Sequence, residues 1–175
     1  MKRLVLTLLA LCCATTLRAE EPATFPVGAF TFTRPAAWTW VPVSSPMRKA
    51  QLRVPGAAAD QAADITFFHF GAGGGGGLDA NIKRWLGQFQ AAEGVSKVEP
   101  QTIAGTKVTI VTTAGTFASG MPDGASTPLP DQALLGAIVE HADGDVFVKM
   151  TGPAPLVKGS RAKFMEFITA AVTKK

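Results

Sequence analysis

The stretch from Phe67 to Leu78 contains the arrangement in this sequence that most resembles a cofactor-binding motif. An apolar segment runs into a glycine-rich loop, in which Gly71, Gly73 and Gly76 satisfy the pattern G-x-G-x-x-G, and an amphipathic segment follows. In dinucleotide-binding domains such glycines let the backbone approach a pyrophosphate at the N-terminus of a helix. The pattern therefore raises the question of whether the chain binds a nucleotide.

The surroundings of the glycine run argue against a nucleotide site. A Rossmann loop needs an acidic residue on a following parallel strand, whereas Glu93 lies 17 residues after Gly76 at the end of the same predicted helix. The G-K-[ST] of a Walker loop is also missing. We interpret the run as a flexible connector that tolerates replacement, with capture of a small anion as the alternative, and we expect no cofactor.

The residue types used in acid–base, nucleophilic and metal chemistry form no known motif. The two histidines, His69 and His141, fall in separate predicted strands, and no H-x-x-x-H or E-x-x-H pair occurs, so we expect packed or surface histidines and no metal. No serine lies in G-x-S-x-G or S-x-x-K. A catalytic triad is therefore not indicated.

The acidic pairs in the sequence fall in predicted turns, where aspartate is common because its side chain bonds to nearby backbone. These pairs are Asp60 with Asp64 and Asp143 with Asp145. Glycosidase carboxylates can be distant in sequence, so a hydrolase that acts on envelope material with carboxylates remains an alternative function.

Basic and aromatic side chains supply the candidate binding residues. The cations Arg48, Lys49, Arg53, Lys83 and Arg84 either converge beside the glycine loop or lie on solvated faces. If they converge, we expect Asn81, Arg84 and Arg48 to contact a ligand. For Trp38, Trp40 and Trp85 we favour burial in the core over exposed stacking on a ligand.

The N-terminal segment has the pattern of an export signal. A basic start, Met1-Lys2-Arg3, precedes an apolar run over residues 4–14 that is too short to span a bilayer. A small residue at Ala19 predicts cleavage before Glu20, so residues 1–19 form a signal peptide and both cysteines leave with it. Lipid attachment is disfavoured because Leu11 precedes Cys12. We expect a periplasmic or secreted protein.

The remaining residues, 20–175, are predicted to form a single α+β domain. They carry 14 basic and 13 acidic side chains, so their charge gives no reason to expect a nucleic-acid partner. No second long apolar segment follows, which predicts no transmembrane segment after cleavage. A chain of this length buries enough surface to fold without disulfides or metals.

Hydrophobic periodicity predicts the elements that must position these residues. Strands are expected over residues 30–33, 38–40, 48–54, 65–70, 95–103, 106–117, 134–141 and 145–151, with a long loop over 118–132. Two amphipathic helices are expected, over residues 78–92 and after an N-cap at Ser160. Because most strands are joined as hairpins, the fold class is α+β: an antiparallel sheet of about six to eight strands flanked by two helices.

Several short segments resemble known exported domains. The F-x-F-x-x-P-x-x-W segment that begins at Phe30, the Gly105-Thr106 turn, the strand over residues 146–150 and a final helix are similar to PsbP-like and DcrB-like domains. That resemblance implies an α/β/α sandwich in an accessory, binding or envelope role, without a common active site. The glycine loop followed by A-N-I-x-R-W resembles a group of exported bacterial proteins of no established function. We therefore expect a non-catalytic protein whose partner is an envelope protein or a small ligand.

Overall fold

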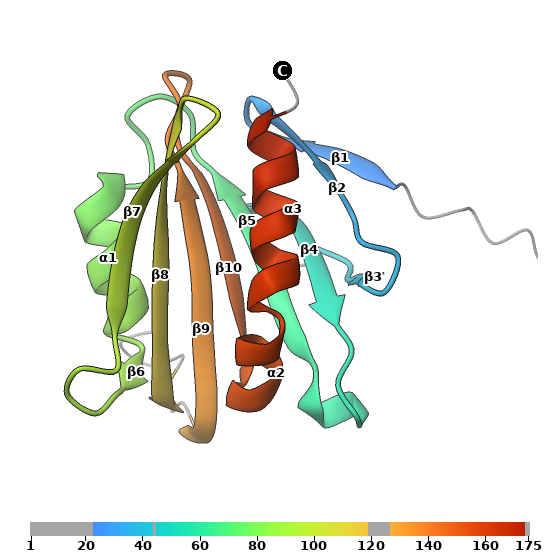
Figure 1. Cartoon of the computed structure of the whole chain (residues 1–175), viewed down its shortest axis with the longest axis vertical. Coiled ribbons are helices and arrows are strands. Elements are labelled where there is room, and N and C mark those ends of the chain that lie inside the picture. Colours follow the sequence, from blue (N-terminus) through green and yellow to red (C-terminus); the bar gives the residue numbers. More distant parts are fainter. Residues whose placement is uncertain (1–22, 44, 119–126, 174–175) are drawn as a thin grey trace, which may run out of the picture.

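A large antiparallel sheet organises the chain and confirms the α+β class. The computed structural model describes residues 23–43, 45–118 and 127–173, so the predicted signal peptide and both cysteines lie outside the described residues. The sheet has eight strands in the order β3-β4-β5-β10-β9-β8-β6, with β7 also paired to β8 (Figure 1). The strands are β3 (Thr39–Trp40), β4 (Arg48–Val54), β5 (Ala63–His69), β6 (Phe89–Gln90), β7 (Lys97–Ile103), β8 (Thr106–Phe117), β9 (Leu129–Val139) and β10 (Val146–Pro153).

A separate hairpin precedes this sheet, formed by β1 (Thr24–Val27) and β2 (Phe30–Thr33). The alternation at Phe30 and Phe32 correctly predicted β2, since both rings are buried. Strand β1 was not predicted from the sequence. The two expected early strands do not pair with each other, because β2 pairs with β1 whereas β3 pairs with β4.

The first core layer lies between one face of the sheet and the elements α2 (Ala154–Gly159), α3 (Arg161–Thr173) and the β1–β2 hairpin (Figure 1). The predicted stripe on α3 faces this layer, and Phe167 contacts the ring of Trp38 at a centroid distance of 5.2 Å. From β10, Val148 and Met150 point to the same side, as their alternation predicts. The short helix α2 was not predicted, and Ser160 lies at its C-cap, where its carbonyl oxygen accepts the Phe164 N–H at 2.9 Å.

The second core layer lies on the opposite face of the sheet, under α1 (Gly77–Leu86). Trp85, Phe89 and Phe147 are buried there, and Leu78 and Ile82 pack against them, so the predicted apolar stripe is confirmed. The helix ends at Leu86 and not at residue 92. Phe89 belongs to β6, where it pairs with Phe117 of β8 and its ring lies 4.9 Å from the Phe117 ring. Pairing with a distant strand therefore overrides the local helical periodicity.

The glycine run has a specific backbone geometry. Gly73, Gly75, Gly76 and Gly77 all have positive φ, between 69° and 85°, a region that side chains with a Cβ rarely adopt. A Cβ on Gly74 would lie 2.4 Å from the carbonyl oxygen of Phe70. This geometry argues against the expectation that the run tolerates replacement, because side chains at these positions would strain the backbone or collide with Phe70.

The remaining predictions concern burial and the long loop. Trp38 and Trp85 are buried as expected, whereas Trp40 is half-buried at the edge of the first core layer. Strand β9 begins at Leu129, inside the expected loop, and the loop residues 119–126 lie outside the described part of the chain. A short 3-10 turn at Ala59–Gln61 joins β4 to β5.

None of the described helices has the length and apolar character needed to cross a membrane.

Candidate functional site

Two of the expected ligand-binding residues hold the glycine run in place. Asn81 is 2% exposed, and its Nδ2 donates hydrogen bonds to the carbonyl oxygens of Gly75 and Gly77, at 2.8 and 2.7 Å. Arg84 Nη1 donates to Oδ1 of Asn81 at 2.7 Å. These bonds engage both ends of the Asn81 amide. The structure therefore brings Asn81 and Arg84 together as a brace for the loop, and this arrangement leaves Asn81 no free polar atom for a ligand.

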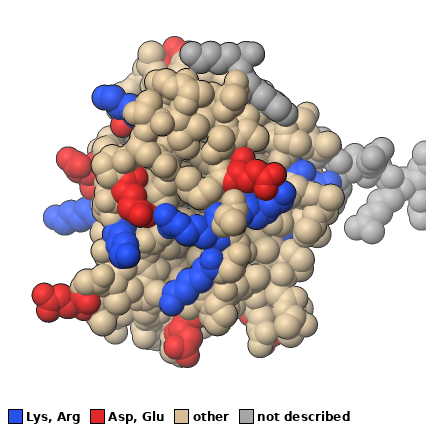
Figure 2. All heavy atoms as spheres, in the orientation of Figure 1, with Lys and Arg blue, Asp and Glu red and all other residues tan. Residues whose placement is uncertain are grey.

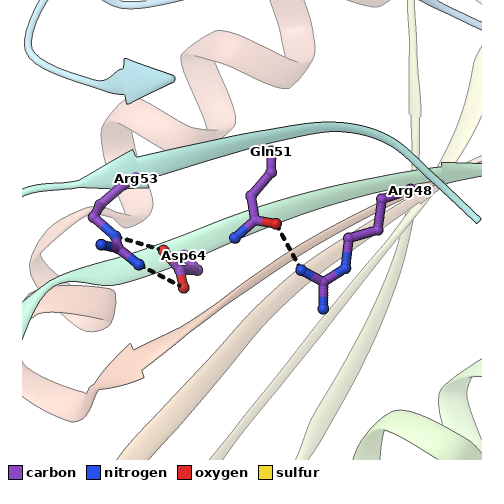
Figure 3. A network of polar contacts seen from close by, with 4 residues as sticks. All are labelled: Arg48, Gln51, Arg53 and Asp64. Atoms are coloured by element: carbon purple, nitrogen blue, oxygen red, sulfur yellow. Dashed lines mark hydrogen bonds and ion pairs between the residues drawn. The ribbon is translucent and has the colours of Figure 1, made fainter. Parts of the chain in front are cut away.

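The third expected residue, Arg48, lies on a strand of the sheet and not on α1. It begins β4, and its Nη1 donates to Oε1 of Gln51 at 2.6 Å (Figure 3). None of the hydrogen bonds or ion pairs among the described residues joins Arg48 to Asn81 or Arg84. The structure therefore places Asn81 and Arg84 together beside the glycine run and Arg48 apart from them, at the start of β4.

The three arginines considered for convergence beside the glycine loop each have a different partner: Arg48 bonds to Gln51, Arg53 to Asp64 and Arg84 to Asn81. Arg53 and Asp64 form a two-point ion pair between β4 and β5, with distances of 2.8 and 3.2 Å (Figure 3). The hydrogen bond to Asp64 and its charge raise the pKa of Arg53. Both side chains are exposed, so this pair contributes modestly to stability.

Lys149, a charged residue within an apolar strand, was not predicted from the sequence as a candidate binding residue. It is half-buried in the middle of β10, on the α1 face, with Thr66 of β5 and Gly136 of β9 beside it in register. Its Nζ donates to Oε1 of Gln88 and lies 5.5 Å from the centre of the Phe117 ring. Burial, and to a smaller degree the charge of Arg48, lower the pKa of Lys149 to about 8.

The two histidines are bonded to the backbone near the β9–β10 turn. Nδ1 of His69 lies 3.2 Å from the carbonyl oxygen of Asp145, and Nδ1 of His141 accepts the backbone N–H of Asp143 at 3.1 Å. The His141 ring also meets the ring of Phe30 edge to face. The part of the chain that the structure describes contains no group of three histidine, cysteine, aspartate or glutamate side chains placed to hold a metal ion.

Three of the four acids considered for a hydrolase are engaged in local contacts, and the fourth, Asp60, is exposed in the 3-10 turn. Asp64 is held by Arg53, and Oδ1 of Asp145 lies 3.4 Å from the backbone nitrogen of His141 in the turn. Asp143 lies 3.7 Å from the His141 ring. Within the described ranges none of the acidic side chains is buried. No observation on these residues specifically favours the hydrolase alternative.

A groove beside α2 and α3, on the face of the sheet opposite α1, has the character of a small-molecule site. Its volume is about 400 Å³, within the range of about 300–1,000 Å³ typical of ligand pockets. Strands β7, β8 and β9 and the two helices contribute its walls. Its apolar lining comes from Val95, Ala114, Ala133, Leu135 and Val157.

Three basic residues and one acidic residue, Glu99, line this groove. Lys97 of β7, Lys158 of α2 and Arg161 of α3 line it, and Figure 2 shows lysine and arginine side chains forming a band across this face of the molecule. Arg161 Nη2 is paired with Oε2 of Glu99 at 2.7 Å. By contrast, within residues 23–43, 45–118 and 127–173 no carboxylate lies within 4.0 Å of the Nζ of Lys97 or Lys158.

Sequence reasoning did not find this groove, because its lysines come from segments far apart in the chain and each is an ordinary surface residue in its own segment. Compared with known proteins, the chain matches no family model and no curated sequence.

Proposed function

We propose that this protein is an exported, non-catalytic binding protein of the cell envelope, periplasmic or secreted, that takes a small amphipathic anion in the groove beside α2 and α3. The observation that carries the proposal is the combination of an apolar lining with two lysines, Lys97 and Lys158, whose Nζ atoms have no carboxylate within 4.0 Å among the described residues, since the one acidic residue of the lining, Glu99, is paired with Arg161. The export step is supported by the basic and apolar pattern at the N-terminus.

The chemistry of the groove defines the class of ligand. Its apolar side chains, such as Leu135 and Val157, favour a hydrocarbon or aromatic portion, because burying that surface removes it from water. The ammonium groups of Lys97 and Lys158 favour a carboxylate or another oxyanion at the rim. A ligand with both parts, such as a fatty acid of medium length, satisfies both halves of the site.

Binding of dodecanoate, measured by isothermal titration calorimetry, tests the proposal. We expect saturable binding to a single site, and weaker binding of the uncharged analogue dodecanol. Reversing both charges, in Lys97→Glu with Lys158→Glu, should lower the affinity by about tenfold or more, since two favourable contacts become repulsive. Ala114→Phe should also weaken binding, because the ring fills part of the groove.

Lys83→Glu is the matched control, since it reverses an exposed charge on α1, across the sheet from the groove. It should leave dodecanoate affinity unchanged. Absence of saturable binding, or an equal loss of affinity in the Lys83→Glu variant, would overturn the proposal.

A further inference from the structure

A second cluster of charge, separate from the groove, lies on the α1 face of the sheet. Its first member is Lys149, and among the described residues its ammonium group has one hydrogen-bond partner, the neutral amide oxygen of Gln88. Lys149 lies in the middle of β10, and the residues before and after it in this strand are largely buried. A lysine in this position holds a positive charge where water has limited access.

Arg48 supplies a second positive charge to the same face. It reaches the amide oxygen of Gln51, a residue that is 6% exposed and that lies in register with Thr66, the neighbour of Lys149. Its partner, like that of Lys149, is neutral. The charge of Arg48 acts on Lys149 across the intervening strand β5, so the two cations belong to one electrostatic environment.

The neighbouring ion pair shows how this face otherwise neutralises a cation. Arg53 projects to the same side of β4 as Arg48, and there Asp64 supplies the opposing carboxylate (Figure 3). Neither Arg48 nor Lys149 has a carboxylate within 4.0 Å in the described part of the chain. Two like charges that share a partly buried site repel each other unless an anion lies between them.

We propose that Arg48 and Lys149 form a binding site for a small oxyanion, a carboxylate or a phosphate, on the α1 face of the sheet. Each residue uses one donor on a glutamine and keeps further N–H groups to donate. Hydrogen bonds between charged partners are among the stronger ones in proteins. Burial, and to a smaller degree the charge of Arg48, lower the pKa of Lys149, and a bound anion would oppose both effects by favouring the charged form of the lysine.

The experiment is an NMR titration of the full chain carrying ¹³C- and ¹⁵N-labelled lysine, with the Lys149 Cε signal assigned by its loss in Lys149→Met. In a buffer free of oxyanions the signal should titrate with a pKa of about 8. Inorganic phosphate or acetate should shift the signal saturably and raise that pKa. Comparison of the two probes tells whether the site prefers a phosphate or a carboxylate.

Matched variants separate this site from general electrostatics. Arg48→Gln should weaken binding of the preferred anion by about tenfold, the loss expected for one charge-assisted hydrogen bond. Arg53→Gln removes an already paired cation from the same strand and should leave the affinity unchanged. The groove variant Lys158→Glu should also bind the anion normally, so failure of the groove proposal and of this one are distinguishable.

Two results would overturn the inference. If neither phosphate nor acetate shifts the Lys149 signal of the unmodified protein, Lys149 has a structural role only. If Arg48→Gln and Arg53→Gln weaken binding equally, the anion responds to the overall field of the sheet and not to a site. The titration of the unmodified protein decides the first point even if a variant folds poorly.

Discussion

The indole ring of Trp85 lies directly against the backbone of Gly136 at the centre of the sheet. A Cβ atom at position 136 would lie 2.2 Å from Cζ3 of Trp85, far inside the separation of about 3.5–4.0 Å at which carbon atoms attract. Glycine at this position therefore allows α1 to approach β9 closely. The contact anchors the helix that carries the brace of the glycine run.

Trp85→Ala should lower the free energy of unfolding by about 3–5 kcal/mol, because it removes a ring that is 5% exposed and leaves a cavity between α1 and the sheet. Gly136→Ala should also be destabilising, since the new methyl group collides with the ring. Urea denaturation measures both effects. Lys83→Ala, an exposed change on the same helix, should stay within about 0.5 kcal/mol of the unmodified protein, and a near-neutral Trp85→Ala would contradict the packing.

Asn81 and Arg84 should behave as one unit in a double-mutant cycle. Asn81→Ala removes two hydrogen bonds to the glycine run and should cost about 1–3 kcal/mol. Arg84→Ala leaves Oδ1 of Asn81 without its donor and should cost less. In the Asn81→Ala background the second change should have almost no effect, because its partner is already gone. Additive losses, measured by denaturant titration, would show that Arg84 acts elsewhere.

The glycine run gives a third prediction, on backbone conformation. Gly75→Ala and Gly76→Ala should each cost about 1–2 kcal/mol, the penalty for placing a Cβ in the left-handed region, where these residues have φ of 81° and 85°. Gly159→Ala is the control, because that glycine is helical and has nothing within 4 Å of the added atom. It should be neutral or stabilising. Equal thermal midpoints for all three variants would mean that the loop can relax.

Hydrophobic periodicity correctly predicted which face of a single helix is buried. It did not predict features that depend on pairing between two distant segments. The stripe containing Ile82 and Trp85 is visible in the sequence because a helix repeats its buried positions locally. The end of that helix is not, since Phe89 is drawn into β6 by pairing with Phe117. Strand β1 was missed because Pro26 interrupts its short apolar pattern.

The candidate sites show the same limit. Arg48 was selected from the sequence, but its neighbour Lys149 was not, because a lysine within an apolar strand gives no sign of which charge will lie beside it. The glycines indicate an unusual backbone, but nothing in the sequence shows that Asn81 donates hydrogen bonds to that backbone. Hydrogen-bond partners are set by the tertiary fold, which the local pattern does not specify.

The pKa of Lys149 predicts a pH dependence of stability. Its value is about 8 in the folded protein and 10.5 in an unfolded chain, so between these pH values the unfolded chain binds more protons. The free energy of unfolding should therefore rise relative to Lys149→Met as the pH increases through this window. Below pH 8 the cost of holding the charge is fully present, and Lys149→Met should be the more stable protein. Urea midpoints in buffers without oxyanions test this, and identical pH profiles would contradict it.

The pairing of β5 with β10 also determines the order in which the chain can fold. Thr66 and Lys149 are 83 residues apart, so the N-terminal strands acquire this neighbour only after almost the whole chain is present. Non-local pairing of this kind slows folding, to about milliseconds or seconds in small β-rich domains. Until then β5 exposes an unpaired edge beside an apolar face. A chain that stops before β10 should therefore aggregate through that edge instead of forming a smaller folded domain.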